Sequence, residues 1–472
     1  MNRLLVANRG EIAVRILHAA AELGLRTVAV FSEDDAASLH VRRADEARPL
    51  RGAGVAAYLD VEQILALAKE SDCAAIHPGY GFLSESAAFA ASVENANLTF
   101  VGPTEGTLAT FGNKATARAL AESCGVPILR GSRDSVTLDE AQAFFTSLGS
   151  GAALMIKAIA GGGGRGMRVV FDRGEIAAAY ERCRSEAQQA FGSGDVYVEE
   201  LLPRARHIEV QVVGDGSGRV VHFGERECSI QRRHQKLVEI APCPSLPAQL
   251  RERLIADALR MASQVKLRNA ATFEFLVDAS PWTPRGSRGG YYFIEANPRL
   301  QVEHTVTEEV FGIDLVRLQL QIASGKTLAD LGLDQASIGT PRGFAVQVRI
   351  NTETIAADGS VRPSGGTLVA FELPSGHGIR SDTCGYVGYR TNPNFDSLLL
   401  KLIGHSTSQR FADAVTRSVR ALGEIRVEGV RTNIPFLRRL LEHPSFVANQ
   451  IDTRFVEENA AGLAATEQED DG

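Results

Sequence analysis

The sequence is short of cysteine, of aromatic side chains and of long apolar runs. Its six cysteines are far apart in a chain of 472 residues and form no C-x-x-C pair, which predicts reduced thiols and excludes a disulfide-stapled miniprotein. No run reaches the roughly 18 apolar residues that a membrane span needs. The opening residues, MNRLLVANRGEIAVRIL, lack the long apolar region and the small-residue cleavage site of a signal peptide. We therefore expect a soluble enzyme of the cytoplasm.

The chain also lacks a strong excess of charge of one sign. Its 50 Lys and Arg residues against 57 Asp and Glu give a formal net charge of −7, which argues against a general affinity for nucleic acid or for a membrane surface. Apolar residues make up 44% of the chain, too large a share for a disordered protein. Glycine is plentiful: it makes up 45 of the 472 residues, which is more than the usual share of about 7%. Because the glycines form no collagen-like repeat, we expect some of them in loops that take part in chemistry.

The first hundred residues alternate short apolar strands with helical patterns. Leu4–Ala7, Thr27–Phe31 and Ala74–His77 read as strands, and the apolar spacing after Ile12 and after Val61 predicts helices. Strands that alternate with helices predict a parallel, doubly wound sheet. Ligands of such sheets bind beyond the carboxyl ends of the strands. Two loops are expected at that edge, residues 8–11 and 77–81.

The pattern changes at about Lys114. Helices are predicted over Lys114–Ser123 and Leu138–Leu148. Long alternating stretches then predict a large antiparallel sheet. These stretches are His207–Val213, Arg219–Phe223, Ala271–Val277 and Tyr291–Ala296. A third region, about 341 to 446, opens with a strand and closes with helices, and the residues from 460 to the end are small and acidic, as in a tail. The expected fold class is α/β together with α+β.

The densest glycine run follows Lys157 and comprises Gly161, Gly162, Gly163, Gly164 and Gly166. It matches G-x-G-x-x-G, but the residues that follow it, from Met167, read as a strand instead of the helix that a dinucleotide site needs. A P-loop is excluded because the run contains no Gly-Lys-Ser/Thr. We expect a hairpin loop whose backbone N–H groups close over phosphates as a lid, with Lys157 beside it. The alternative is a flexible turn without a ligand.

Two apolar strands carry carboxylates. Glu274 lies among phenylalanines, and Glu295 and Asn297 share one face of the next strand. If the two strands pair, Glu274 lies near Glu295, where two carboxylates repel each other. A divalent cation removes this repulsion, and oxygen ligands suit Mg²⁺ that bridges to nucleotide phosphates. The alternative is that these acids face solvent or pair with arginine.

Directly after Asn297 the chain crowds Arg299, Glu303 and His304 into a few residues. A second polar run covers residues 225–236 and is too mixed in sign for a nucleic-acid tract. The functional interpretation is a site for a small anion next to phosphates, with a carboxylate available as a base. The alternative for the second run is a solvated charged face.

Taken together, these segments resemble biotin carboxylase, an ATP-grasp ligase, from residue 1 to about residue 446. The matching blocks are Ala7–Ala13 (ANRGEIA), His77–Glu85 (HPGYGFLSE), the glycine loop after Lys157, Gln231–Lys236 (QRRHQK), Asn297–His304 (NPRLQVEH) and Val348–Asn351 (VRIN). The glycine loop and the carboxylates are common to ATP-grasp enzymes. The HPGYGFLSE, QRRHQK and RLQVEH blocks, in this order, are much more specific.

The resemblance implies three domains and a tail. They are a Rossmann-like N-terminal (pre-ATP-grasp) domain over residues 1–113, an ATP-grasp domain over 114–334 with a mobile glycine-rich lid at about 131–202, a biotin carboxylase C-terminal domain over 335–446, and a tail or linker over 447–472.

The implied reaction is phosphorylation of bicarbonate by ATP to carboxyphosphate, followed by carboxylation of N1′ of a carrier-bound biotin. The residues implied to bind ATP are Lys114, Lys157, Gly161, Gly162, Gly163, Gly164, Gly166, Met167, Glu199, Leu202, His207, Gln231 and His234. Those implied to bind bicarbonate or biotin are Tyr80, Lys236, Arg299, Gln301, Val302, Glu303 and Arg349. Among them, Glu303 is implied as the base, Arg349 as the group that stabilises the biotin enolate, and Lys236 and Arg299 as catalytic cations. The implied metal ligands are Glu274, Glu295 and Asn297.

The resemblance also implies cofactors and partners. These are ATP, two Mg²⁺ or Mn²⁺ ions, a biotin carboxyl carrier, a carboxyltransferase and a second copy of the chain, with no nucleic acid and no membrane. The sequence has no Met-Lys biotin attachment site within a small β-domain, so we expect the biotin to be a carrier-bound substrate. The expected final acceptor is an acyl-CoA.

Three other functions compete with this interpretation of the sequence. Another ATP-grasp ligase, such as a carbamoyl-phosphate synthetase half, would need a different acceptor site from QRRHQK and RLQVEH. An NAD-dependent oxidoreductase would show a glycine fingerprint after the first strand, where Ala7-Asn8-Arg9-Gly10 stands. A non-catalytic scaffold is disfavoured by the complete set of charged residues.

The chain departs from the family pattern at a few places. Ala160 stands where some relatives have a fifth glycine, and Glu200 where lysine is frequent. The Ala279–Gly290 hairpin loop, with the single tryptophan Trp282, is longer than in simple members. Residues 358–367 look more like the versions in multidomain acyl-CoA or pyruvate carboxylases.

Overall fold

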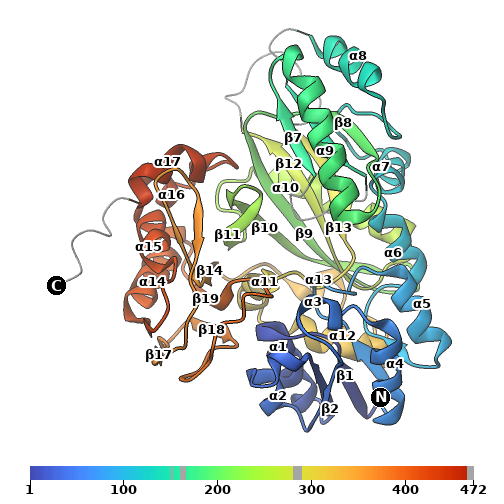
Figure 1. Ribbon diagram of the computed structural model, residues 1–472, viewed down its shortest axis with the longest axis vertical. Coiled ribbons are helices and arrows are strands. Elements are labelled where there is room, and N and C mark those ends of the chain that lie inside the picture. The colour runs from blue at the N-terminus through green and yellow to red at the C-terminus, as the bar shows by residue number, and fades with distance from the viewer. Residues whose placement is uncertain (150–152, 160–165, 280–289, 465–472) are drawn as a thin grey trace.

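The computed structural model describes residues 1–149, 153–159, 166–279 and 290–464 (Figure 1). The N-terminal region forms the predicted parallel sheet, with five strands in the order β3-β2-β1-β4-β5. The strands are β1 (Arg3–Val6), β2 (Arg26–Phe31), β3 (Glu46–Pro49), β4 (Ala75–His77) and β5 (Thr99–Phe100). The main helices around this sheet are α1 (Gly10–Glu22), α4 (Val61–Glu70), α5 (Ala87–Asn95) and α6 (Glu105–Gly112).

Strand β1 is apolar along its whole length because both faces of this sheet are covered. Leu4 and Val6 pack in one core cluster, and Leu5 packs in another on the opposite face. A strand buried on both faces reads as a continuous apolar run, which is why its pattern lacks alternation. Its carboxyl end places the loop before α1 next to the loop after β4, where Asn8 Nδ2 donates to the backbone oxygens of Pro78 and Tyr80 at 2.6 and 2.8 Å.

A small three-stranded sheet forms a separate body at the top of Figure 1. It consists of β7 (Met167–Val170), β6 (Leu154–Ala158) and β8 (Val196–Glu200), packed against α8 (Leu138–Leu148) and α9 (Ile176–Phe191) around its own apolar core. Helix α8 begins at a capping box between Thr137 and Glu140, a sequence signal for a helix start. The glycines 161–164 and Ala160, which we predicted between β6 and β7, lie outside the described residues, as does Trp282.

The large antiparallel sheet has eight strands in the order β13-β12-β9-β10-β11-β14-β19-β18. They are β9 (Ala205–Asp215), β10 (Val220–Arg232), β11 (Gln235–Ala241), β12 (Arg268–Asp278), β13 (Tyr291–Asn297), β14 (Phe344–Asn351), β18 (Ile379–Thr383) and β19 (Leu398–Ser406). Strand β11 pairs with β14, with Val238 opposite Val348. The sheet therefore runs across the predicted division at residues 334 and 335, which places QRRHQK and VRIN on one continuous surface.

The C-terminal helices cover the β14–β19 end of this sheet (Figure 1). The apolar side chains of Phe455, Val456 and Leu463 are buried in the same core cluster as this end of the sheet. The tail predicted over 447–472 is therefore incorrect up to Ala464, because Phe455–Ala464 forms a helix that buries its apolar side chains. The helices are α14 (Phe411–Glu424), α15 (Ile434–Glu442), α16 (Pro444–Val447) and α17 (Phe455–Ala464). Among the described helices, none is long and apolar enough to cross a membrane.

Candidate active site

A row of charged residues crosses four neighbouring strands of the large sheet. Glu295 on β13 is opposite Glu274 on β12, Glu274 is opposite Glu209 on β9, and Glu209 is opposite Arg226 on β10. Residues directly opposite each other in a sheet share a face, so three carboxylates and a guanidinium lie side by side. This register confirms the prediction that Glu274 lies near Glu295.

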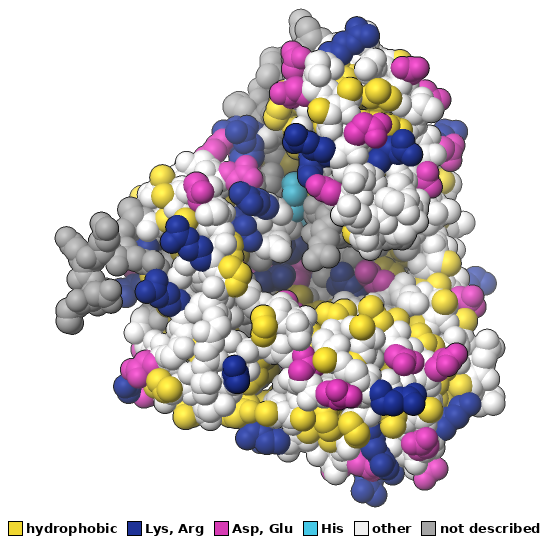
Figure 2. Space-filling view, in the orientation of Figure 1, with side chains coloured by type: hydrophobic (Ala, Val, Ile, Leu, Met, Phe, Trp, Pro, Cys, Tyr) yellow, Lys and Arg dark blue, Asp and Glu magenta, His cyan; other side chains and the backbone are white. Residues whose placement is uncertain are grey.

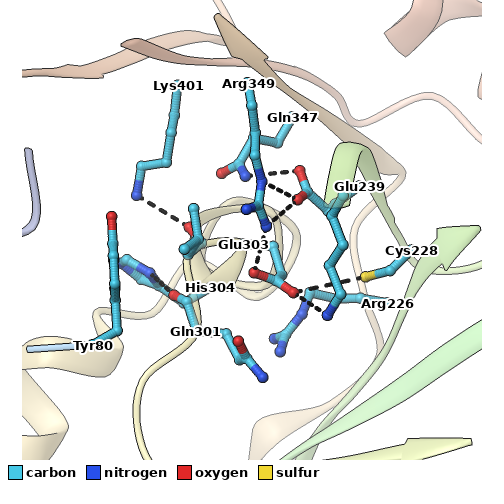
Figure 3. Close-up of polar contacts among 12 residues, drawn as sticks. Tyr80, Arg226, Cys228, Glu239, Gln301, Glu303, His304, Gln347, Arg349 and Lys401 are labelled. Atoms are coloured by element: carbon cyan, nitrogen blue, oxygen red, sulfur yellow. Dashed lines mark hydrogen bonds and ion pairs between the residues drawn. The ribbon is translucent and has the colours of Figure 1, made fainter. Parts of the chain in front are cut away.

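The centre of the site is an ammonium group surrounded by carboxylates. Lys236 Nζ, from β11, lies 2.7 Å from Glu209 Oε2, 3.4 Å from Glu274 Oε1 and 2.6 Å from Glu303 Oε1. Figure 3 shows Glu303 pointing from the start of helix α11 (His304–Phe311) into this group. Segments far apart in sequence therefore supply one buried ion cluster.

Arg349 contacts the second carboxylate oxygen of Glu303. Its Nη2 lies 3.0 Å from Glu303 Oε2, and its Nε donates to Glu239 Oε1 at 2.6 Å (Figure 3). Glu239 also accepts from Gln347 Nε2 at 2.8 Å. Gln347 thus fixes Glu239, and the two carboxylates hold the guanidinium in one orientation, because its planar fork has fixed donor directions.

The charges around Glu303 determine its protonation state. Burial alone would raise its pKa, but Lys236 and Arg349 together hold the pKa of this carboxyl well below its usual value. Burial also raises the pKa of Glu274, but Lys236 and His207 outweigh this effect and lower the pKa to about 2. Both side chains are therefore carboxylates at neutral pH although they are buried.

Oxygen donors around Glu274 could hold a divalent cation. Asn297 Nδ2 and Gln301 Nε2 donate to Glu274 Oε1 at 2.6 and 3.0 Å. His207 Nε2 lies 2.5 Å from Glu274 Oε2, and one ligand atom each of His207, Glu209 and Glu274 lie within 4.8 Å of one another. Together with Glu295 these residues offer mostly carboxylate oxygen, the ligand type that Mg²⁺ prefers, so the donor set fits the predicted metal.

Two lysines lie near Glu295, Lys114 at the start of the helix over Lys114–Ser123 and Lys157 on β6. Lys157 on β6 forms an ion pair with Glu199 on β8, and Glu199 also lies 3.4 Å from Arg118 Nη1. Burial lowers the pKa of Lys114, although Glu295 opposes this effect. Lys114, Arg118 and Tyr197 line one small cavity. The structure thus brings Lys114, Lys157 and Glu199 together.

The remaining predicted nucleotide residues that the structure describes lie in the β10–β11 hairpin and at the ends of β7 and β8. Gln231 Nε2 lies 2.6 Å from His207 Nδ1, whereas His234 is exposed at the tip of the β10–β11 hairpin, where its φ is +67°. Gly166 and Met167 stand at the start of β7, and Leu202 follows the end of β8. The sheet of β7, β6 and β8 falls within the predicted lid and is called the lid sheet. Figure 2 shows a hollow between the lid sheet and the lower part of the molecule, with basic side chains and a histidine at its walls.

The predicted anion-binding loop follows β13. Arg299 Nη1 donates to Gln301 Oε1 at 2.8 Å, and Arg299 Nε lies 3.0 Å from Glu85 Oε1. The backbone oxygen of Val302 accepts from Lys401, and the hydroxyl of Tyr80 donates to Glu11. The loop is therefore contacted both by the segment between β4 and α5 and by β19.

Sequence reasoning missed several residues of this cluster. Glu209 stands two residues after His207 in a strand that alternates polar and apolar side chains, so the period of two could have found it. Three other residues carried no such signal: Arg226 stands between two glutamates in the polar run, and Glu239 and Lys401 each follow and precede apolar residues. Only the strand order brings them to Glu303.

Comparisons with known proteins agree with this geometry. Three family models match the chain in succession: "Biotin carboxylase, N-terminal domain" over residues 1–108, "Carbamoyl-phosphate synthase L chain, ATP binding domain" over 113–331, and "Biotin carboxylase C-terminal domain" over 347–458. The biotin carboxylase domain of Hydrogenobacter thermophilus 2-oxoglutarate carboxylase is 38% identical, with a TM-score of 0.91 and coverage of 99% of each chain. The chain belongs to the biotin carboxylase family. Biotin carboxylases are ATP-grasp ligases that carboxylate N1′ of biotin.

Other biotin carboxylases and biotin-dependent enzymes are similar as well. A biotin carboxylase from Campylobacter jejuni, in complex with β,γ-ATP, is 35% identical with a TM-score of 0.90, over 97% of this chain and 98% of that one. The pyruvate carboxylase of Aspergillus niger is 48% identical over 461 residues, and the mitochondrial pyruvate carboxylase of Homo sapiens is 46% identical over 464. The chain spans 38% of the length of these two proteins. The Hydrogenobacter domain is a dimer in complex with MgADP, ADP and bicarbonate.

The order of the family models bears on the carbamoyl-phosphate synthetase alternative. The ATP-binding model carries that enzyme's name, as expected for an ATP-grasp domain common to both. The models on either side are specific to biotin carboxylase, and they contain the HPGYGFLSE block and the VRIN block. The alternative is therefore disfavoured.

Proposed function

We propose that this chain uses ATP and bicarbonate to carboxylate carrier-bound biotin through carboxyphosphate, the first half-reaction of a biotin-dependent carboxylase. The observation that carries the proposal is the position of Glu303. A buried carboxylate is held between Lys236 and Arg349, beside a row of carboxylates that can bind metal. This arrangement provides a base, anion-binding cations and a phosphate site within one cluster.

Bicarbonate would bind beside Glu303. Lys236 and Arg299 supply cations, and Gln301 and the Val302 backbone supply polar contacts, so that the anion lies next to the carboxylate. The same cations that keep Glu303 ionised also stabilise the dianion that forms when bicarbonate loses its proton. Because an incoming anion takes a share of those cations, the proton affinity of Glu303 rises when the substrate binds. Glu303 is thus an unprotonated base that becomes stronger in the complex.

ATP would lie between the lid sheet and the carboxylate row. Lys114 and Lys157 would hold its phosphates, and the 161–166 loop would close over them. Glu199, Leu202, His207, Gln231 and His234 would contact the base and ribose. Glu274, Glu295 and Asn297, together with Glu209, would hold two Mg²⁺ or Mn²⁺ ions, which supply charge neutralisation on the phosphates. When the nucleotide takes the charge of Lys157, the Glu199 carboxylate keeps Arg118 as a partner.

Biotin would enter from the side of Tyr80 and Arg349. The guanidinium of Arg349 is positioned by Glu239 and would stabilise negative charge on the ureido oxygen, which makes N1′ nucleophilic. A biotin carboxyl carrier must present the biotin, and a carboxyltransferase must receive the carboxyl group. We propose that the chain acts with both in a cytoplasmic assembly, and as a homodimer.

The final acceptor belongs to the whole assembly. The sequence led us to expect an acyl-CoA, and a single-chain long-chain acyl-CoA carboxylase is 44% identical with a TM-score of 0.85. The curated relatives at 48 and 46% identity are pyruvate carboxylases, which favours a 2-oxo acid. We therefore propose pyruvate as the first acceptor to test and acyl-CoA as the second. Fixation of labelled bicarbonate by the native assembly, with pyruvate and with acyl-CoA esters in parallel, separates them.

The biotin carboxylase reaction itself can be tested with the chain alone. ATP hydrolysis is measured with Mg²⁺, with and without bicarbonate, and then with free biotin or a biotinylated carrier. We expect hydrolysis that requires bicarbonate and increases with biotin. ATP turnover without any dependence on bicarbonate would overturn the proposal.

A further inference from the structure

Lys401 is a completely buried lysine that no role in the reaction accounts for. It stands on β19, directly opposite Arg349 on β14 and Asp382 on β18. Its side chain has 0% exposure. A buried ammonium is costly unless all its donors have partners, so its contacts indicate what it holds in place.

The buried ammonium of Lys401 makes one hydrogen bond and two ion pairs. Nζ donates to the backbone oxygen of Val302 at 3.1 Å (Figure 3), lies 3.0 Å from Glu11 Oε2, and lies 3.8 Å from Asp382 Oδ2. Glu11 in turn accepts from the Tyr80 hydroxyl. One lysine on β19 therefore connects the Val302 backbone, helix α1 and, through Glu11, Tyr80.

The contact with Val302 fixes the backbone just before Glu303. The Val302 oxygen belongs to the peptide unit that carries the Glu303 nitrogen. Lys401 donates to this oxygen from β19. The preceding peptide unit is fixed as well, because Gln301 O lies 2.7 Å from His304 Nδ1. Two successive peptide units of the anion-binding loop are thus each held by one buried side chain.

The buried carboxylates around Lys401 depend on its charge. Burial raises the pKa of Glu11, and Lys401 is the largest influence that opposes this rise. Burial also works against ionisation of Asp382, but Arg380 and Lys401 keep its pKa below the usual value. Removing the ammonium would thus affect both the charge balance and the loop geometry, and an experiment must separate the two effects.

We propose that Lys401 is a positioning residue for biotin carboxylation: through Val302 it sets the orientation of the bicarbonate loop and of Glu303, and through Glu11 it sets Tyr80 at the biotin end. The inference rests on the proposed function. It goes beyond that function because Lys401 touches neither bicarbonate nor ATP in the arrangement above, and acts through residues that do.

The test compares Lys401→Met with the double variant Lys401→Met/Glu11→Gln. The single variant removes the Val302 hydrogen bond and leaves Glu11 without its cation. The double variant also removes the uncompensated carboxylate, while a glutamine can still accept from Tyr80. We measure thermal stability, KM for bicarbonate, KM for ATP and the stimulation of turnover by biotin.

We expect the single variant to raise KM for bicarbonate about tenfold, the scale of losing one charge-assisted hydrogen bond, with KM for ATP within about twofold. In the double variant, stability should recover, but the high KM for bicarbonate and the weak biotin response should remain. Recovery of all parameters in the double variant would show that Lys401 only balances charge and would overturn the inference. An equal rise of both KM values would overturn it too.

Arg251→Met serves as the matched control. Arg251 is a cation paired with Glu225, 2.7 Å from its Oε1, and it donates to the Cys243 oxygen at 2.9 Å. We expect its loss to reduce stability without separating the two KM values. If the unmodified chain shows no bicarbonate-dependent turnover, the proposed function has failed. Normal turnover with unchanged KM values in both Lys401 variants contradicts this inference alone.

Discussion

Lys236 and Glu303 form a buried ion pair, with Nζ 2.6 Å from Oε1. They come from β11 and from the start of α11, and Arg349 flanks the same carboxylate on its other side. Breaking a buried pair by removing one partner is strongly destabilising, so variants here must be judged on stability and on activity separately.

Glu303→Gln should abolish bicarbonate-dependent ATP turnover while nucleotide binding remains. A general base contributes about 10²–10⁴-fold, so we expect a loss of about 100-fold or more in kcat. ADP affinity, measured by calorimetry, should change less than about threefold, because Glu303 does not contact the phosphates in this arrangement. Glu309→Gln is the control on the same helix, since Glu309 contacts Arg380 at 3.3 Å and not Lys236. Lost ADP binding in the Glu303 variant would contradict the assignment as base.

Lys157→Met should weaken nucleotide binding by about tenfold, the scale of one hydrogen bond to a charged group. Glu199 keeps Arg118 as a partner in this variant, so the lid sheet should stay folded. Calorimetry with MgADP gives the affinity, and circular dichroism checks the fold. Arg130→Met is a suitable control, because Arg130 is an exposed cation of the same body that donates to Ser147. Unchanged ADP affinity for Lys157→Met would exclude a phosphate contact.

Glu295→Gln should raise the Mg²⁺ concentration needed for half-maximal turnover by at least about tenfold. Glu295 lies opposite Glu274 in the sheet, and an amide is a weaker ligand for a hard cation than a carboxylate. The measurement is ATP hydrolysis over a Mg²⁺ titration at saturating ATP. Metal-free ADP binding in the presence of a chelator should be unchanged, which separates loss of metal from loss of nucleotide. An identical Mg²⁺ titration curve would rule out Glu295 as a ligand.

Acidification should destabilise the protein partly through Glu274. Its pKa in the folded state is about 2, lower than the value of about 4.3 expected in the unfolded chain. A lowered folded pKa stabilises above the unfolded value, and this contribution is lost as the pH falls through about 4 toward 2. Urea unfolding from pH 6 to pH 3.5 should therefore show a smaller loss of stability for Glu274→Gln than for the parent chain. Parallel curves would contradict the lowered pKa.

Several elements were predictable because their information is local. Lys114–Ser123 and Leu138–Leu148 form helices over the predicted residues, since apolar spacing and N-cap signals act within a few turns. The pairing of Glu274 with Glu295 was predictable because two strands joined by one loop have few ways to pair. The helix over Phe455–Ala464 was not, because small and acidic residues hide three buried apolar side chains.

The sequence by itself determined the strands, the spacing of the carboxylates and the motif blocks that carry the family resemblance. Period-two alternation is enough to put Glu295 and Asn297 on one face. Only the tertiary structure decided that Glu239, Arg349 and Lys401 stand next to one another, because more than a hundred residues separate β11 from β14, and several dozen more separate β14 from β19. The reason is physical: a local pattern fixes which face a side chain occupies, whereas its cross-strand neighbours depend on how the whole chain buries its apolar surface.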